Sequence, residues 1–185
     1  MKNEKKPASD VETSKFLSFV LRHKPEAIGL SLDGEGWAEV DILLRLAAEH
    51  GTMVAREDLL RVVEQNDKKR FTLSADGLRI RAAQGHSTAQ VDITFTPATP
   101  PEILFHGTAG RFMDSIRDKG LLAGDRQYVH LSKDAETAET VGKRHGKAVV
   151  LTVRAGDMAR DGLLFYLSDN DVWLTREVPS RYLDE

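Results

Sequence analysis

The chain has 185 residues, of which 41% are hydrophobic and 30% are charged, a composition typical of a globular protein with one domain or two small ones. The formal net charge is −3, and neither residues 1–96 (14 Lys/Arg, 15 Asp/Glu) nor residues 97–185 (12 and 14) are basic. Bulk charge therefore offers no general attraction to nucleic acid, and any such site must be a local cluster.

Targeting signals and cysteine chemistry are missing from the sequence. No apolar run reaches the roughly 18 residues of a membrane span, and the first residues have no apolar signal-peptide core. The chain contains no cysteine, which excludes disulfides, thiol nucleophiles and cysteine-ligated zinc. We expect a cytoplasmic protein that does not enter a membrane.

After a tail over residues 1–13 that we expect to be disordered, Ser14 to His23 has the pattern of an amphipathic helix, with Phe16, Leu17, Phe19, Val20 and Leu21 on one broad arc. Pro25 disfavours helix at the residue before it, so Arg22 and His23 leave a packed helix at a fixed point. Cations in a last helical turn are also favoured by the helix dipole alone, and by itself this pair does not establish a site.

Two further helices and a hairpin follow. Val40–His50 and Arg56–Gln65 have helical spacing, and Asp76-Gly77 between two alternating runs predicts a hairpin in which Leu73 faces Ile80 and Phe71 faces Ala82. Three helices and a hairpin are the element order of a winged helix. The opposite face of the hairpin would gather a basic patch suited to a polyanion: Lys68, Lys69, Arg70, Arg79 and Arg81.

A second unit follows a proline-rich joint. We place a winged-helix lobe at residues 14–88, a linker at 89–101, in which Val91, Ile93 and Phe95 alternate as a short strand, and a second lobe at 102–185. The second lobe is predicted to contain short strands and two helices, at 103–105, 111–119, 128–132, 135–144, 149–153, 163–167 and 172–175. The fold class is α+β.

Common cofactor motifs are not found. The sequence has no GxGxxG and no GxxxxGK[ST], and its six histidines include no HExxH and no i, i+4 pair. We therefore expect no metal site. A lone histidine such as His106 or His130 is most often a structural residue, and the pattern alone stops at a two-lobed protein with a basic patch.

Several ordered motifs together resemble the NAD-dependent RNA 2′-phosphotransferases, over about Ser14 to Leu183. They are Leu21-Arg22-His23-Lys24-Pro25, Arg70-Phe71, residues 76–87 ending in Gln84-Gly85-His86-Ser87, Phe105-His106-Gly107-Thr108, residues 126–132, residues 141–146 and Val172-Trp173-Leu174-Thr175. The resemblance implies a winged-helix lobe that holds RNA and an ADP-ribosyltransferase-like lobe with a split antiparallel sheet that holds NAD, with the chemistry in the cleft between them.

The resemblance also implies a reaction. An internal RNA 2′-monophosphate attacks the nicotinamide-bearing ribose of NAD, and the 2″-hydroxyl of that ribose then attacks phosphorus, which leaves an RNA 2′-OH and ADP-ribose 1″,2″-cyclic phosphate. The catalytic set carries over onto Arg22, His23, Arg70 and Arg126. The cofactor-binding set carries over onto His106, Gly107, Thr108 and Ser132, with Gly107 allowing close approach, whereas Trp173 is expected to pack in the core.

Two alternatives remain open at this stage. The chain could ADP-ribosylate phosphorylated nucleic-acid ends or other acceptors and stop after the first step, or it could be a non-enzymatic winged-helix module. Many ADP-ribosyltransferases carry a late glutamate in a Q-x-E or E-x-E triplet, and no such triplet follows Ser132. A phosphate monoester is already an anionic nucleophile, so this absence favours a phosphate acceptor. The expected partners are NAD and an RNA with a 2′-phosphate, with tRNA as one option, and we expect the chain to act as a monomer.

Overall fold

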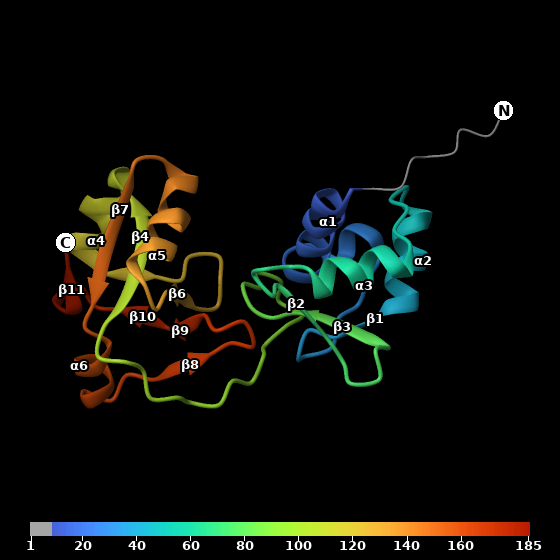
Figure 1. The fold of residues 1–185 in the computed structure, drawn as a ribbon. Helices are drawn as coiled ribbons and strands as arrows, with labels where there is room; N and C mark the ends of the chain where they lie inside the picture. The colour runs from blue at the N-terminus through green and yellow to red at the C-terminus, as the bar shows by residue number, and fades with distance from the viewer. Residues whose placement is uncertain (1–8) are drawn as a thin grey trace. The chain divides into compact units, whose positions relative to one another are not determined.

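The computed structural model describes residues 9–185, which divide into two compact units at Thr94 and Phe95. Both units combine helices with small antiparallel sheets, which confirms the α+β class (Figure 1). The division falls inside the segment that the sequence predicts as a linker. Within residues 9–185, no helix has the length and apolar character needed to cross a bilayer.

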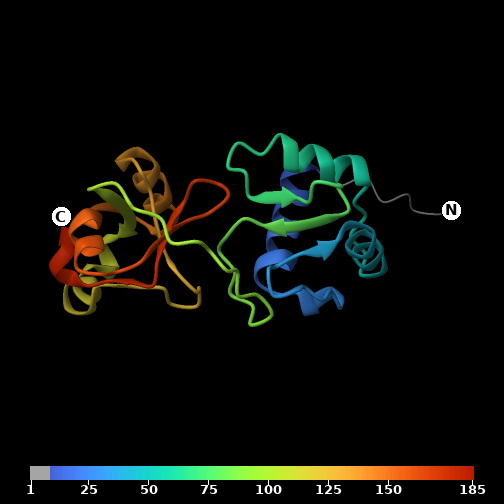
Figure 2. The ribbon, with the colours of Figure 1, turned by 90° about the horizontal axis from the view of Figure 1, so that it is seen from below.

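Unit 1 contains the three predicted helices and the predicted hairpin. Its elements are α1 (Asp10–Arg22), η1 (Pro25–Ile28), β1 (Ala38–Glu39), α2 (Val40–Glu49), α3 (Arg56–Glu64), β2 (Phe71–Leu73) and β3 (Arg79–Ala82). The two-residue strand β1 was not predicted because it is too short to show an alternating pattern. It pairs with β3, so that the sheet has the order β1-β3-β2, and Figure 2 shows the three strands side by side.

Helix α1 begins earlier than the sequence analysis expected. The predicted disordered tail ran to residue 13, but α1 starts at Asp10 because Ser9 and Glu12 form a capping box that satisfies backbone donors of the first turn. The rest of the predicted tail, residues 1–8, lies outside the described residues.

The apolar arc of α1 is narrower than predicted, but the helix ends where expected. Leu17, Val20 and Leu21 are completely buried, whereas 44% of Phe19 is exposed. Arg22 is the last helical residue and His23 is its C-cap. Pro25 then opens η1 with its fixed φ, so the chain leaves α1 in one defined direction.

The hairpin has the predicted register. Leu73 pairs with Ile80 and Phe71 with Ala82. The loop is longer than the two predicted residues, because the last backbone bond joins the Ser74 N–H to the Arg79 carbonyl at 2.9 Å and leaves residues 75–78 in the turn. Gly77 takes the left-handed conformation there, with a φ of 70°.

The strand predicted around Val91 and Ile93 is wrong, although the alternation behind it is real. Both side chains are buried, with 1% and 4% exposure, yet they belong to no strand. The backbone between them is held by a bond from the Asp92 N–H to the Gly34 carbonyl at 2.8 Å. The first part of the predicted linker is therefore packed into unit 1.

Unit 2 is built on short strands in three antiparallel sheets, ordered β11-β7-β4, β6-β9-β8 and β10-β5. Its elements are β4 (Leu104–Ala109), η2 (Gly110–Phe112), α4 (Met113–Lys119), β5 (Leu121–Leu122), β6 (Val129–Leu131), α5 (Ala135–Gly142), η3 (Lys143–His145), β7 (Ala148–Val153), α6 (Ala155–Arg160), β8 (Phe165–Leu167), β9 (Trp173–Thr175), β10 (Glu177–Val178), η4 (Ser180–Tyr182) and β11 (Leu183–Asp184). The predicted strands and helices are present, but the strand predicted at 103–105 runs on to Ala109 as β4. Helix α6 and the two-residue strands were missed because they are too short for a periodic signal.

Strand β4 connects the two larger sheets of unit 2. It pairs with β7 along its whole length, and Phe105 forms a bridge with Ser132 just beyond the end of β6. Helix α5 packs against one face of β4. The other face contributes Leu104 to a core that includes Leu151 and Trp173, which confirms the expected packing role of Trp173.

Candidate active site

The segment that follows the hairpin of unit 1 holds the end of α1. The Arg22 carbonyl, which has no partner within the helix, accepts hydrogen bonds from the N–H groups of Ser87 (2.8 Å) and Thr88 (3.2 Å). The Ser87 hydroxyl also hydrogen-bonds Nδ1 of His23 at 2.8 Å. These contacts position both Arg22 and His23 against one loop.

The backbone of Arg70 lies beside the Arg22 side chain, whereas its guanidinium reaches Ser14, about two turns before the end of α1. Its carbonyl accepts a long hydrogen bond from Nη2 of Arg22 at 3.4 Å, and its own Nη1 reaches Oγ of Ser14 at 3.5 Å. Of the three predicted catalytic residues of unit 1, Arg22 and His23 are held by the same loop, and Arg22 also contacts the backbone of Arg70.

The predicted basic patch is smaller than its sequence suggests. Arg79 and Arg81 stack on Trp37, with guanidinium carbons 5.4 and 4.7 Å from the ring centroid. They also pair with Asp33 at 3.9 Å and Glu35 at 3.8 Å, so nearby carboxylates offset their charge. Arg79 and Arg81 therefore contribute less uncompensated charge to the predicted basic patch than the sequence suggests.

Arg70 differs from Arg45, Arg56 and Arg61 in its surroundings. Arg45 and Arg56 pair with carboxylates at 2.9 and 2.5 Å, and Arg61 pairs with two. Within residues 9–185, no carboxylate forms an ion pair with Arg70. Its charge is thus available to an anionic ligand.

His86 is a buried histidine in the surroundings of Arg22, Arg81 and His23. Burial lowers the pKa of His86 to about 4, with smaller contributions from the charges of Arg22, Arg81 and His23. Nothing in the described part of the chain hydrogen-bonds its Nε2, which lies close to Gly36. His86 is therefore neutral near pH 7, and it adds no charge next to the arginines.

In unit 2, His106 is tied to the neighbouring sheet. Its Nδ1–H donates to the carbonyl of His130 at 3.0 Å, which leaves Nε2 as an acceptor when the ring is neutral. Burial lowers the pKa of His106, and the charges of Arg126 and His145 lower it further, so the neutral form is favoured.

Gly107 permits a close approach, but the partner differs from the one expected. A Cβ at this position would lie 1.6 Å from the Ala138 carbonyl oxygen, so the missing side chain makes room for α5 and not for a ligand. The polar groups of its backbone face another way. The N–H and carbonyl of Phe105 bond Ser132, at the edge of β4 that faces β6. Along an antiparallel strand every second residue directs its backbone polar groups to the same edge. The N–H and carbonyl of Gly107, two residues later, therefore face this edge as well.

The remaining predicted cofactor residues lie along these strands. Thr108 is two residues beyond His106 on β4 and is 6% exposed, whereas Ser132 is half-buried at the bridge to β4. Gly107 therefore presents one donor and one acceptor next to His106 and Ser132. This combination fits a carboxamide together with the hydroxyl groups of a ribose.

Arg126 lies in the turn before β6, and its Nη1 donates to Nδ1 of His130 at 2.7 Å. Desolvation lowers the pKa of its guanidinium, and the nearby charge of Arg144 lowers it further. No described carboxylate pairs with Arg126. In this respect Arg126 resembles Arg70.

Comparison with known proteins shows the family of the chain. Residues 8–177 match the family described as “RNA 2'-phosphotransferase, Tpt1 / KptA family”. The chain belongs to this family. It is 57% identical over 173 residues to a “Probable RNA 2'-phosphotransferase” of Pectobacterium carotovorum subsp. carotovorum, covering 94% of this chain and 93% of that protein.

Two further relatives match this chain over a similar length, and their names also describe an RNA 2'-phosphotransferase. A “Probable RNA 2'-phosphotransferase” of Pseudomonas aeruginosa is 58% identical over 174 residues, covering 94% of this chain and 96% of its own. The “RNA 2'-phosphotransferase” of Escherichia coli (strain K12) is 56% identical over 182 residues, covering 98% and 97%. The match therefore includes both units.

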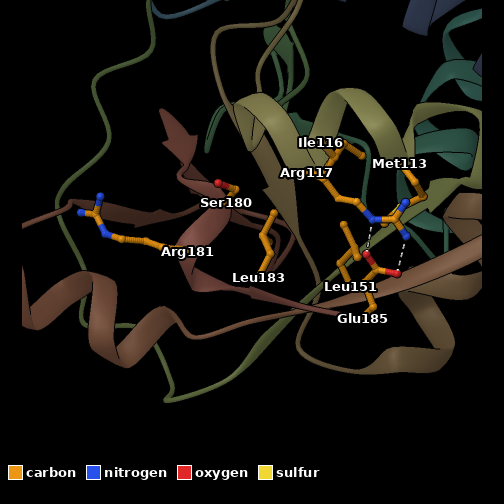
Figure 3. A pocket seen from close by; sticks show the side chains of 8 residues that line it. All are labelled: Met113, Ile116, Arg117, Leu151, Ser180, Arg181, Leu183 and Glu185. Atoms are coloured by element: carbon orange, nitrogen blue, oxygen red, sulfur yellow. Dashed lines mark hydrogen bonds and ion pairs between the residues drawn. The ribbon is translucent and has the colours of Figure 1, made fainter.

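A pocket elsewhere in unit 2 does not contain the predicted residues. It has a volume of about 280 Å³ and is lined by Met113, Ile116, Arg117, Leu151, Ser180, Arg181, Leu183 and Glu185. Figure 3 shows Arg117 and Glu185 bonded to each other, at 2.6 Å, and Arg181 directed away from the other lining residues. Because the charges of Arg117 and Glu185 neutralise each other, this pocket is a poor site for a phosphorylated substrate.

Sequence reasoning missed three residues at the candidate site: His86, Ser87 and His130. All three stand inside motifs that carried the family resemblance, at 84–87 and 126–132. Their positions were visible, but their roles depend on contacts with Arg22, His23 and Arg126 that only folding creates.

Proposed function

We propose that this chain removes an internal 2′-monophosphate from RNA by transferring it to NAD. A 2′-phosphate oxygen attacks the ribose carbon that carries nicotinamide, and nicotinamide leaves. The 2″-hydroxyl of the attached ADP-ribose then attacks phosphorus, and the RNA 2′-oxygen leaves and takes up a proton. The products are RNA with a 2′-OH and ADP-ribose 1″,2″-cyclic phosphate. The observation that carries the proposal is that Arg70 and Arg126, two arginines at positions matching the family's catalytic set, have no carboxylate partner within residues 9–185, in a member of this family.

Unit 1 is proposed to be a winged-helix lobe that holds the RNA phosphate. Guanidinium groups bind a phosphate dianion through two parallel hydrogen bonds and keep their charge at any working pH, which suits Arg22 and Arg70 to this task. Nδ1 of His23 is engaged by Ser87 at 2.8 Å, so we assign Nε2 to a phosphate oxygen or to the departing ribose oxygen.

Unit 2 is proposed to be an ADP-ribosyltransferase-like lobe that holds NAD, which supplies the electrophilic ribose carbon. The backbone N–H and carbonyl of Gly107 would bind the nicotinamide carboxamide. Nε2 of neutral His106 would accept from a ribose hydroxyl, and Thr108 and Ser132 would supply further hydroxyl contacts.

Arg126 is assigned to the second step. Negative charge grows on the phosphorus oxygens as the 2″-hydroxyl attacks, and a preoriented cation stabilises that state more than the ground state. A cation already neutralised by a carboxylate would contribute less, and Arg126 has no such partner in the described chain.

The test is incubation of the protein with NAD and an oligoribonucleotide carrying one internal 2′-phosphate, with RNA and nucleotide products followed by mass. We expect dephosphorylated RNA and ADP-ribose cyclic phosphate. Arg70→Ala should slow consumption of the RNA, and Arg126→Ala should accumulate the ADP-ribosylated RNA. Arg45→Ala, which removes an exposed arginine paired with Glu49, is the matched control and should behave like the unmodified protein.

Two results would redirect the proposal. A stable ADP-ribosylated RNA from the unmodified protein would support the alternative in which the reaction stops after its first step. RNA left unchanged while NAD is bound would overturn the proposed substrate.

A further inference from the structure

His130 lies between two of the predicted site residues and contacts both. Its Nδ1 accepts from Nη1 of Arg126 at 2.7 Å, and its carbonyl accepts from Nδ1 of His106 at 3.0 Å. Its backbone is fixed by pairing with Leu174 in the sheet β6-β9-β8. A half-buried ring on a paired strand is thus joined to an arginine in the preceding turn.

The hydrogen bond from Arg126 determines which nitrogen of the His130 ring carries the proton. A guanidinium has only donors and keeps its charge, so Nδ1 of His130 must present a lone pair and the proton must reside on Nε2. His130 therefore holds Arg126 as a neutral acceptor. The charge of Arg144 acts on Arg126, and the charges of Arg126 and His145 act on His106, so the groups known to face this contact are cationic or neutral.

A neutral acceptor leaves the charge of an arginine in place, whereas a carboxylate offsets it. Arg117, Arg154 and Arg160 of the same unit are held by carboxylates at 2.6 to 2.9 Å, and these partners offset their charge. Within residues 9–185, the His130 ring is the side chain that hydrogen-bonds Arg126. It restrains a long, flexible side chain without cancelling the charge that a phosphate would bind.

We propose that His130 is a positioning residue for Arg126, which orients the guanidinium for the second step and leaves its charge uncompensated. The inference rests on the role proposed for Arg126 above. It assigns to His130 no contact with RNA or NAD, and it is therefore separable from the cofactor set at His106 and Ser132.

Two substitutions at His130 distinguish the role of its Nδ1 acceptor from the role of its planar ring. His130→Phe keeps a planar ring and removes Nδ1, whereas His130→Asn places an amide oxygen near the position of Nδ1. Loss of one hydrogen bond to a charged group corresponds to a second step that is about 10- to 100-fold slower. We expect His130→Phe to accumulate the ADP-ribosylated RNA and His130→Asn to restore most of the rate.

A double-mutant comparison supplies the readout that a structural role would not move. In an Arg126→Ala background, His130→Phe should slow the second step no further, because the residue it orients is gone. His50→Phe, the same chemical change in unit 1, is the control, and thermal unfolding of each variant checks the fold. Equal defects in His130→Phe and His130→Asn, or a full additional loss in the Arg126→Ala background, would overturn the proposal.

A second measurement needs no activity and separates this inference from the proposed function. Nitrogen-15 NMR of the imidazole reports which nitrogen carries the proton. We expect the Nε2–H tautomer for His130 near pH 7.5, and a mixture of tautomers in Arg126→Ala. A proton on Nδ1 in the unmodified protein would refute the positioning role even if the RNA reaction proceeds as proposed. A pH–rate profile is less informative, because the phosphate monoester itself titrates at about pH 6.

Discussion

Replacing Gly107 by alanine tests whether this glycine serves the packing of α5. The added Cβ would lie 1.6 Å from the Ala138 carbonyl oxygen, 2.5 Å from the carbon of that carbonyl and 2.9 Å from the Gly142 nitrogen. Contacts under 3.0 Å essentially do not occur, so α5 and β4 would have to separate by at least 1.4 Å, the difference between 3.0 and 1.6 Å. All three atoms are backbone, and no side-chain rotation can relieve the clash.

The expected cost lies at the upper end for overpacking, about 3 kcal/mol of unfolding free energy. For a unit of this size that corresponds to a fall in Tm of roughly 12–24 °C, or in the urea midpoint of about 1–3 M. The loss should appear without NAD or RNA, because its cause is the contact between α5 and β4. A ligand-binding role alone would leave the stability of the free protein unchanged.

The two tryptophans allow each unit to be followed by itself. Trp173 is buried in the core of unit 2 and Trp37 belongs to unit 1, so Trp37→Phe and Trp173→Phe backgrounds report separate urea transitions. Gly110→Ala is the matched control, because a Cβ there meets nothing within 4 Å. If Gly107→Ala destabilises unit 2 no more than Gly110→Ala does, the packing argument fails. If it shifts the Trp37 transition equally, the effect is not local.

Three further predictions concern unit 1. The pKa of His86 is about 4 in the folded chain, against an ordinary histidine value of 6.5, so the unfolded chain takes up the proton first as pH falls. Stability should therefore be full above pH 6.5 and decline by about 3 kcal/mol between pH 6.5 and 4, and urea titrations with Trp37 fluorescence should show this decline disappearing in His86→Asn. Ser87→Ala removes the hydroxyl that holds His23 and should slow RNA turnover about 2- to 10-fold, whereas an unchanged rate would show that the bond does not orient the ring. Ser9→Ala breaks the capping box and should cost unit 1 about 1 kcal/mol in the same urea assay, with Ser18→Ala as the control within α1.

Local patterns were sufficient to predict the longer elements and the family. The helices α1, α2 and α3 follow from apolar spacing, and the register of Leu73 with Ile80 follows from the position of Asp76-Gly77. Ordered motifs predicted the family to which the chain belongs. These features are readable because periodicity, turn chemistry and motif order are encoded within short segments.

Contacts between distant segments decided what the site residues do. Asp33 and Glu35 pair with Arg79 and Arg81, whereas no carboxylate within residues 9–185 pairs with Arg70. Ala138 approaches Gly107 from α5, so the glycine that suggested room for a ligand makes room for a helix. His130 holds Arg126, and Ser87 holds His23 across 64 positions of sequence.

The physical reason is that charge compensation and close packing depend on pairs of groups, and a linear sequence names each group without its partner. An arginine is cationic wherever it stands, so the sequence by itself determined which residues carry charge. Only the tertiary structure decided which of those charges lie beside carboxylates, as at Arg79 and Arg81, and which, as at Arg70 and Arg126, have no carboxylate partner within residues 9–185.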